Sequence, residues 1–272
     1  MARLAPHKVV LHGHELSYVD SGSGPAVLFI HGILGSQVQW AHLVDEVDVD
    51  HRVLVPDLFG HGESAKPTGD YSLSAHAATL RDLLDHLGVE RAVVAGASLG
   101  GRAAVDLALA APERVRALVL VGSGLAGHRF AEPALFELWD RSEAALERGD
   151  HEEAARVEIG TWVAGMGRGP EAVDPEVGRR VREMLLAAYA HGEADLEEPD
   201  PPAATRLGVL AVPTLVVVGE HDRPDIYAMA DALAGGIAGA ERVVLAGTGH
   251  LPNLERPAAF NRVVLEFLGR VV

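Results

Sequence analysis

The chain has 272 residues, 48% of them hydrophobic, which is ample for one α/β domain that carries an insertion. Its net charge of -16 at pH 7 argues against nucleic acid and anionic membrane surfaces as partners, and the absence of cysteine excludes disulfides, thiolate metal sites and a cysteine nucleophile. No apolar run approaches the roughly 18 residues of a membrane helix, and the first residues lack the apolar core of a secretory signal, so we expect a cytoplasmic protein.

Taken in chain order, the predicted elements begin with an antiparallel hairpin over KVVLHGHELSYVDSGSGP that turns at residues 12 to 14. Short apolar runs then alternate with helical patterns, which is typical of βα units on a mainly parallel sheet. The predicted strands cover residues 26–30, 52–57, 91–96, 116–122, 213–220 and 241–247.

One predicted helix, SLSAHAATLRDLLDHLG, has residues typical of a helix start, an apolar face and a helix end. Ser72 or Ser74 can cap its start, and Gly88 can end it. Its apolar stripe consists of Leu80, Leu83, Leu84 and Leu87.

The strand pattern stops between residues 125 and 205. This stretch is rich in Ala, Glu and Arg and ends in the loop LEEPDPPAA, so it predicts several inserted helices, while residues 1–124 and 206–272 form the α/β core. It holds 18 acidic and 8 basic residues, a net charge of -10. That charge indicates a solvated outer face, or alternatively a site biased against anionic substrates.

A candidate nucleophile lies in Gly96-Ala97-Ser98-Leu99-Gly100, which fits G-x-S-x-G between a predicted strand and a predicted helix. Small residues on both sides of Ser98 allow a tight turn that exposes its hydroxyl, and the following helix N-terminus favours developing negative charge. The alternative is a structural serine between glycines.

A serine needs a base and an orienting carboxylate, in the chain order Ser, Asp or Glu, His. Asp222 follows the strand predicted over 213–220, and His250 follows the strand predicted over 241–247. Glu220 and Asp225 are rival acids. The segment GSGLAG after Val121 holds no carboxylate, so the acid is not expected there.

A candidate oxyanion loop, HGILGS, follows the strand at 26–30. The backbone N–H groups of Ile33 and Leu99 are the predicted donors, and their side chains can be apolar because only the backbone is needed. The alternative is that His31 and Gly32 merely end a strand.

These motifs together resemble the α/β-hydrolase fold family, in the subgroup with a helical cap between the sixth and seventh strands of that family's sheet. The matching stretches are FIHGILGS, DLFGHGESAKP, LDHLGVERAVVAGASLGG, APERVRALVLVGSG, VVVGEHDRPD and GTGHLPNLERPAAFNRVVLEFL, which cover everything except the cap. The resemblance implies a mostly parallel central sheet flanked by helices. It also implies Ser98 as nucleophile, Asp222 as orienting acid, His250 as base, and Ile33 and Leu99 as oxyanion donors. In this family GHGESAKP is a structural turn, so His61 and Ser64 receive no chemical role.

The resemblance implies a hydrolase that forms an acyl-enzyme on Ser98. A serine at this turn argues against dehalogenases and epoxide hydrolases, which use a carboxylate, and no P-loop, Rossmann or H-E-x-x-H motif suggests a nucleotide or metal cofactor. The final segment is similar both to carboxylesterases and enol-lactonases and to hydrolases that cleave carbon–carbon bonds in ring-fission products. Those carbon–carbon hydrolases and the enol-lactonases take carboxylated substrates, so a cationic side chain is expected in the pocket of either. Arg102, four residues after Ser98, is one candidate, but a salt bridge on the helix surface or between elements is the favoured role for it.

We therefore predict a small, fairly apolar neutral ester or lactone as substrate. The residues suggested as cap contacts are Leu125, Trp139, Trp162 and Met166, although residues of each of these types are more often core than pocket. We expect no nucleic acid or membrane partner and either a monomer or a homodimer. The alternative from another class is a small-molecule receptor or scaffold that retains the fold.

Overall fold

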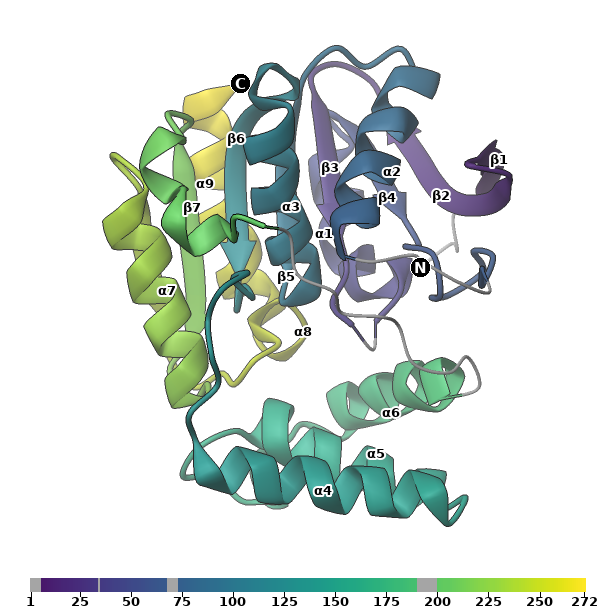
Figure 1. Cartoon of the computed structure of the whole chain (residues 1–272), viewed down its shortest axis with the longest axis vertical. Coiled ribbons are helices and arrows are strands. Elements are labelled where there is room, and N and C mark those ends of the chain that lie inside the picture. Colours follow the sequence, from purple (N-terminus) through teal and green to yellow (C-terminus); the bar gives the residue numbers. More distant parts are fainter. Residues whose placement is uncertain (1–5, 34, 68–72, 190–199) are drawn as a thin grey trace.

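The structure is a computed structural model that describes residues 6–33, 35–67, 73–189 and 200–272 (Figure 1). Within these residues one sheet of eight strands has the order β1-β2-β4-β3-β5-β6-β7-β8. The strands are β1 (His7–Leu11), β2 (His14–Gly22), β3 (Ala26–Ile30), β4 (Arg52–Pro56), β5 (Ala92–Ala97), β6 (Val115–Val121), β7 (Thr214–Gly219) and β8 (Glu241–Leu245). Pairs β1–β2 and β2–β4 are antiparallel, and all the others are parallel. The predicted hairpin, strands and fold class are thus confirmed.

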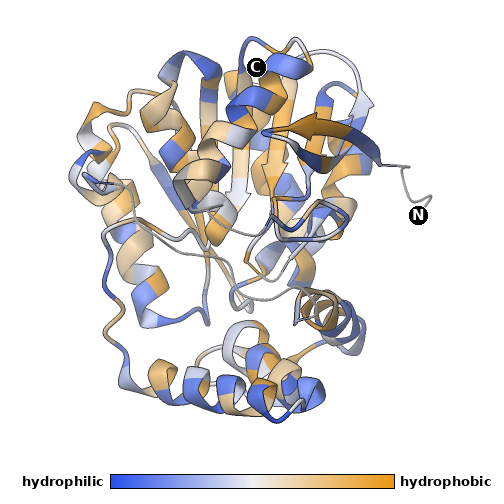
Figure 2. Ribbon diagram, turned by 45° about the vertical axis from the view of Figure 1, so that its right-hand side comes forward, coloured by the Kyte–Doolittle hydropathy of each residue, from blue (hydrophilic) through white to orange (hydrophobic). Residues whose placement is uncertain are grey.

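The central strands are apolar along their whole length because both faces of the sheet are covered. Every residue of β3, β5 and β7 is buried, which explains why these strands read as continuous apolar runs and not as alternating patterns. Figure 2 shows the same distribution, with hydrophobic residues along the strands and hydrophilic residues toward the outside.

Helices pack on both faces of this sheet. Helices α2 (Leu73–His86), α3 (Leu99–Ala110) and α7 (Pro224–Gly236) contribute to one buried cluster, and α1 (Ala41–Val47) and α9 (Pro257–Val271) to the cluster on the other face. The short helix α8 (Pro252–Glu255) precedes α9. The 3₁₀ turns are η1 (Gln37–Trp40), η2 (Pro112–Arg114), η4 (Pro170–Ala172), η5 (Ala203–Thr205) and η6 (Leu207–Val209). No helix in the described ranges has both the length and the apolar character to cross a bilayer.

Helix α2 follows its predicted pattern. Leu80, Leu83 and Leu84 are fully buried, and Gly88 has a φ of +64° two residues after the helix ends, a conformation that favours glycine. Ser72 lies outside the described residues, and Ser74 is already the second residue of the helix.

Between β6 and β7 the chain forms helices α4 (Pro133–Glu147), α5 (His151–Glu158) and α6 (Pro175–Tyr189), with the π-helical turn η3 (Ile159–Ala164) after α5. We call this stretch the helical insertion, and Figure 1 shows it across one end of the sheet. It packs on the rest of the chain through α8, since Leu254 joins the buried cluster of the insertion. The boundaries at 125 and 205 stay a prediction, and residues 196–199 of the loop LEEPDPPAA lie outside the described residues.

Candidate active site

Ser98 occupies a strained turn between β5 and α3. Its φ of 51° and ψ of -113° are sparsely populated by residues other than glycine. Hydrogen bonds hold the turn: the Ser98 N–H donates to Val121 O at 2.9 Å, and the Ser98 carbonyl accepts from Arg102 N at 3.1 Å and Gly124 N at 3.0 Å. A surrounding that fixes such a backbone conformation is typical of a functional turn.

The two glycines of G-x-S-x-G are required by close backbone contacts. A Cβ on Gly96 would lie 2.1 Å from the Gly100 oxygen, and a Cβ on Gly100 would lie 2.3 Å from the Ile30 oxygen. Any side chain at either position would therefore move α3 away from the strands, and Ser98 with it.

The acid and base predicted from the sequence lie side by side. Asp222 follows β7 and His250 follows β8, both are buried, and His250 Nδ1 lies 3.0 Å from each carboxylate oxygen of Asp222. A carboxylate only accepts, so Nδ1 carries the proton and donates it, and Nε2 of a neutral ring is the nitrogen that can take a proton. This is the tautomer that a general base beside a serine needs.

The segment after β6 connects this pair to Ser98. Ser98 bonds the backbone of Val121 and Gly124, and between them a Cβ on Gly122 would lie 2.9 Å from both Cε1 and Nδ1 of His250. The ring of His250 therefore packs on the same short segment that holds the turn of Ser98.

The rival acids have other partners. Glu220 accepts from Gly247 N at 2.8 Å. Asp225 accepts from the N–H groups of Ala131 and Glu132, at 3.0 and 3.1 Å, and lies 2.9 Å from His128 Nε2. Asp222 is the carboxylate that the structure places on His250.

The Gly32–Ile33 peptide lies beside Ser98 and is held from its carbonyl side. A Cβ on Gly32 would lie 3.4 Å from Ser98 Cβ. The Gly32 oxygen accepts from Gly35 N at 3.0 Å and lies 2.7 Å from His31 Nδ1. Because a trans peptide is planar, with its C=O and N–H pointing in opposite directions, fixing this carbonyl also fixes the direction of the Ile33 N–H.

The protonation state of His31 follows from its contacts. The Leu58 N–H donates to His31 Nε2 at 3.0 Å, so Nε2 must carry a lone pair and Nδ1 the proton that bonds the Gly32 oxygen. Burial, and then the neighbouring His61, lower the pKa of His31 well below its usual value, which keeps this neutral tautomer.

Two further side chains hold the same loop and have no counterpart among the predicted residues. Gln39 Oε1 accepts from Gly32 N at 2.9 Å, and His61 Nε2 forms a hydrogen bond with the Ile33 oxygen. Ser64 has a structural role, since its hydroxyl donates to Asp57 O at 2.6 Å. The signal for His61 was its place in GHGESAKP, but nothing local indicates that its ring reaches Ile33.

The four residues suggested as cap contacts lie in different surroundings. The Trp162 ring centroid is 4.7 Å from that of His250. Leu125 is buried in the core cluster that covers one face of the sheet, and the Trp139 ring contacts Phe130 at a centroid distance of 5.2 Å. Met166 is 40% exposed. Trp162 is thus brought to the predicted base.

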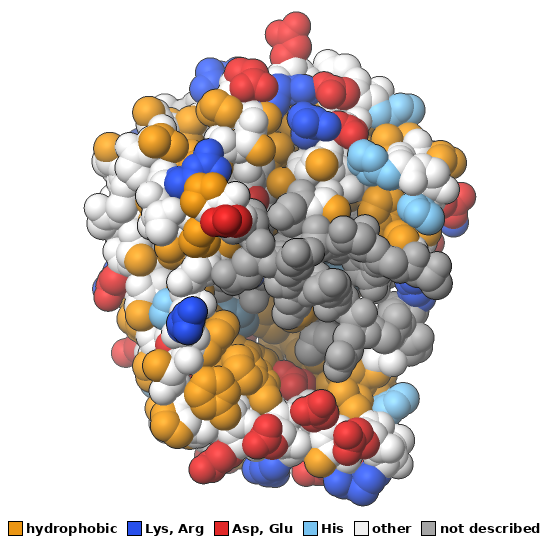
Figure 3. Space-filling model, viewed as in Figure 1, with side chains coloured by type: hydrophobic (Ala, Val, Ile, Leu, Met, Phe, Trp, Pro, Cys, Tyr) orange, Lys and Arg blue, Asp and Glu red, His pale blue; other side chains and the backbone are white. Residues whose placement is uncertain are grey.

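Figure 3 shows apolar side chains gathered near the start of the insertion, with charged side chains along its outer edge. A cavity of about 320 Å³ lies between α6 and residues 35–38. Its lining includes Ser36, Val38, Arg180 and Met184.

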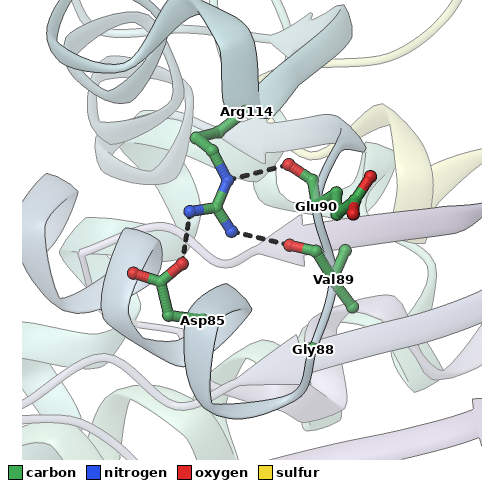
Figure 4. A pocket seen from close by; sticks show the side chains of 5 residues that line it. All are labelled: Asp85, Gly88, Val89, Glu90 and Arg114. Carbon is green, nitrogen blue, oxygen red and sulfur yellow. Dashed lines mark hydrogen bonds and ion pairs between the residues drawn. The ribbon is translucent and has the colours of Figure 1, made fainter.

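A second cavity, of about 430 Å³, lies at the opposite end of the parallel strands from Ser98, before β5 and β6 begin (Figure 4). Arg114 crosses it and donates to the Glu90 oxygen at 2.8 Å, to the Val89 oxygen at 2.6 Å and to the carboxylate of Asp85. Because its guanidinium already joins these segments, we assign Arg114 a structural role and propose no ligand for this cavity.

Comparison with known proteins identifies the family of the chain. The sequence profile of the family described as "alpha/beta hydrolase fold" matches residues 25–257, so the chain belongs to the α/β-hydrolase family. It is 30% identical over 266 residues to a 2-hydroxy-6-oxononadienedioate/2-hydroxy-6-oxononatrienedioate hydrolase of Paraburkholderia xenovorans, covering 93% of this chain and 90% of that enzyme. An uncharacterized protein of Mycobacterium tuberculosis is 42% identical over 114 residues, which are 42% of this chain and only 33% of that protein.

Solved structures extend the likeness over the whole fold. A thermophilic esterase from Thermogutta terrifontis superposes with a TM-score of 0.82 at 30% identity, covering 98% of this chain and 99% of the esterase. The enol-lactonase from Burkholderia xenovorans superposes with a TM-score of 0.78 at 26% identity, covering 97% of this chain and 100% of the lactonase. Esterases, lactonases and other hydrolases are thus among the proteins that this member of the family resembles.

Proposed function

We propose that the protein is a serine hydrolase that cleaves a small, fairly apolar, neutral carboxylic ester or lactone through an acyl-enzyme on Ser98. The observation that carries this proposal is the pairing of His250 Nδ1 with buried Asp222, beside the strained turn of Ser98. The likeness to an esterase and an enol-lactonase supports the choice of reaction.

The proposed mechanism uses the chain's own groups. His250 Nε2 takes the hydroxyl proton as Ser98 Oγ attacks the substrate carbonyl carbon, and the N–H groups of Ile33 and Leu99 stabilise the resulting oxyanion. The tetrahedral intermediate then expels the alkoxide, which receives the proton from His250, and leaves an ester on Ser98. Water attacks this ester by the same steps and releases the acid.

The helical insertion serves in this proposal as a cap over the site, with Trp162 on the ring of His250. The excess of acidic residues in the insertion favours a neutral substrate over an anionic one. The second candidate is carbon–carbon bond hydrolysis of a ring-fission product. It is favoured by the similarity to the P. xenovorans enzyme, whose name describes a dicarboxylate substrate.

The test is steady-state hydrolysis of p-nitrophenyl acetate, butyrate and octanoate beside a carboxylated 2-hydroxy-6-oxo-dienoate. We expect turnover of the esters, with a preference for one chain length, and little turnover of the dienoate. A dienoate rate far above the ester rates would establish the second candidate. If the folded protein binds a lactone or ester without turning it over, a receptor role replaces the enzymatic one.

A further inference from the structure

The stretch 162–168 of the helical insertion contacts both loops that carry the predicted acid and base. On the acid side, Met166 N donates to His221 O at 2.7 Å, one residue before Asp222. On the base side, His250 N donates to Trp162 O at 2.8 Å. One stretch of the insertion therefore joins the loop after β7 to the loop after β8.

Arg168 ends this stretch and makes four hydrogen bonds there. Its Nε donates to Ala164 O at 2.6 Å and one Nη2 proton to Val163 O at 2.7 Å, within the insertion. Its Nη1 donates to Gly247 O at 2.8 Å, and Nη2 also donates to a carboxylate oxygen of Glu255 at 3.0 Å. The side chain of Arg168 is 14% exposed and that of Glu255 is 9% exposed, so solvent screens this ion pair little.

Glu255 in turn holds both neighbours of His250. Its carboxylate accepts from Gly249 N at 2.8 Å and from Leu251 N at 3.3 Å. The proposed base, His250, is thus the middle residue of three, and the N–H groups of both its neighbours donate to the carboxylate of Glu255. That carboxylate is fixed by the guanidinium of Arg168.

The loop of His250 packs closely on the backbone of the insertion at Trp162 and Val163. A Cβ on Gly249 would lie 2.5 Å from both the Trp162 and Val163 oxygens and 3.2 Å from Arg168 Nη2. The loop of His250 and the insertion are therefore in direct backbone contact at this point. A small shift of the insertion must be accompanied by a shift of this loop.

We propose that Arg168 is a positioning residue that acts through Glu255 to hold the imidazole of His250 in register with Asp222, so that a correctly placed insertion is a condition for catalysis. This inference rests on the proposed function. The role suits arginine because its planar guanidinium presents several donors in fixed directions, whereas a lysine ammonium cannot serve three carbonyls and a carboxylate in this geometry. Arg168 does not touch the reacting atoms in this account.

The test compares Arg168→Met and Arg168→Lys with Arg182→Met as the matched control. Arg182 also pairs with a glutamate, Glu152, but that pair is exposed on the insertion. We expect Arg168→Met to lower kcat for a p-nitrophenyl ester on the order of 10²-fold while KM stays near the wild-type value, as for a misplaced catalytic group. We expect Arg168→Lys to have a kcat between those of Arg168→Met and the wild type, and Arg182→Met to change neither kcat nor KM.

A second readout does not depend on turnover. We expect the Nδ1 proton of His250, bonded to buried Asp222, to give a downfield proton NMR resonance, which its absence in His250→Gln would assign. We expect Arg168→Met to broaden this resonance by faster exchange with water, at a temperature where circular dichroism shows the variant folded.

An unchanged resonance and unchanged kcat in Arg168→Met would overturn the inference, as would a rise in KM alone. A wild type that turns over no ester but whose resonance still depends on Arg168 would contradict the proposed function and leave the positioning role standing.

Discussion

Two substitutions of His31 separate its contribution to the oxyanion loop from its contribution to stability. The neutral ring makes two bonds in opposite directions, donating from Nδ1 to Gly32 O and accepting at Nε2 from Leu58 N. An asparagine amide nitrogen takes about the place of Nδ1, and a glutamine amide oxygen takes about the place of Nε2. His31→Asn therefore keeps the bond to the loop and loses the acceptor for Leu58, whereas His31→Gln does the reverse.

The magnitudes follow from what each variant leaves without a partner. In His31→Gln the Gly32 carbonyl keeps only the bond from Gly35 N, so the direction of the Ile33 N–H is held less firmly. Complete loss of one oxyanion donor costs about 10²- to 10³-fold in kcat, and a donor that is only less firmly directed should cost less than the top of that range. In His31→Asn the buried Leu58 N–H loses its acceptor, at a cost of about 1–3 kcal/mol in the free energy of unfolding.

The assay pairs urea unfolding with steady-state ester hydrolysis for both variants. We expect His31→Gln to be nearly as stable as the wild type with kcat lowered up to about 10²-fold, and His31→Asn to be less stable with kcat nearly unchanged. Equal losses of kcat in the two variants would refute the assignment of Nδ1 as the donor that orients the loop.

Three further results are expected. Gly249→Ala places a Cβ 2.5 Å from the Trp162 oxygen and should lower both the melting temperature and kcat, whereas Gly269→Ala, which meets nothing within 4 Å, should change neither in a thermal and kinetic comparison. Asp222→Asn should lower kcat on the order of 10⁴-fold in steady-state assays, because the amide no longer selects the Nδ1–H tautomer of the base. Burial, and then a neighbouring histidine, lower the pKa of His76 from 6.5 to about 4. Between pH 6.5 and 4, His76 is therefore protonated in the unfolded state and neutral in the folded state. As pH falls across this range, this group alone lowers the free energy of unfolding by about 3 kcal/mol. Urea titrations across this range should show the loss, and His76→Leu should reduce it.

Elements whose signals are local could be predicted from the sequence. The strands were predictable because a strand buried on both faces is a short continuous apolar run, as in 26–30 and 213–220. The turn at Ser98 was predictable because its close contacts restrict positions 96 and 100 to glycine, and such a requirement is visible in five letters of sequence.

Contacts made by the docking of distant segments could not be predicted. Arg168 and Glu255 are separated by 87 residues, and neither lies in a pattern that indicates a partner. The contact of Trp162 with His250 likewise depends on how the insertion meets the sheet, so the sequence offered Trp162 as only one of four candidates. The tautomer of His31 needed the position of Leu58 N, which a sequence does not contain.

Covalent labelling shows whether Ser98 is the nucleophile. Wild type and Ser98→Ala would be treated with a fluorophosphonate, and separately with p-nitrophenyl acetate under rapid quench, followed by intact mass measurement and peptide mapping. We expect one phosphonyl or acetyl group on Ser98 and a burst of p-nitrophenol close to the enzyme concentration in the wild type, and neither in Ser98→Ala. A folded wild type without modification, or with the modification on another residue, would contradict the assignment of Ser98 as the nucleophile.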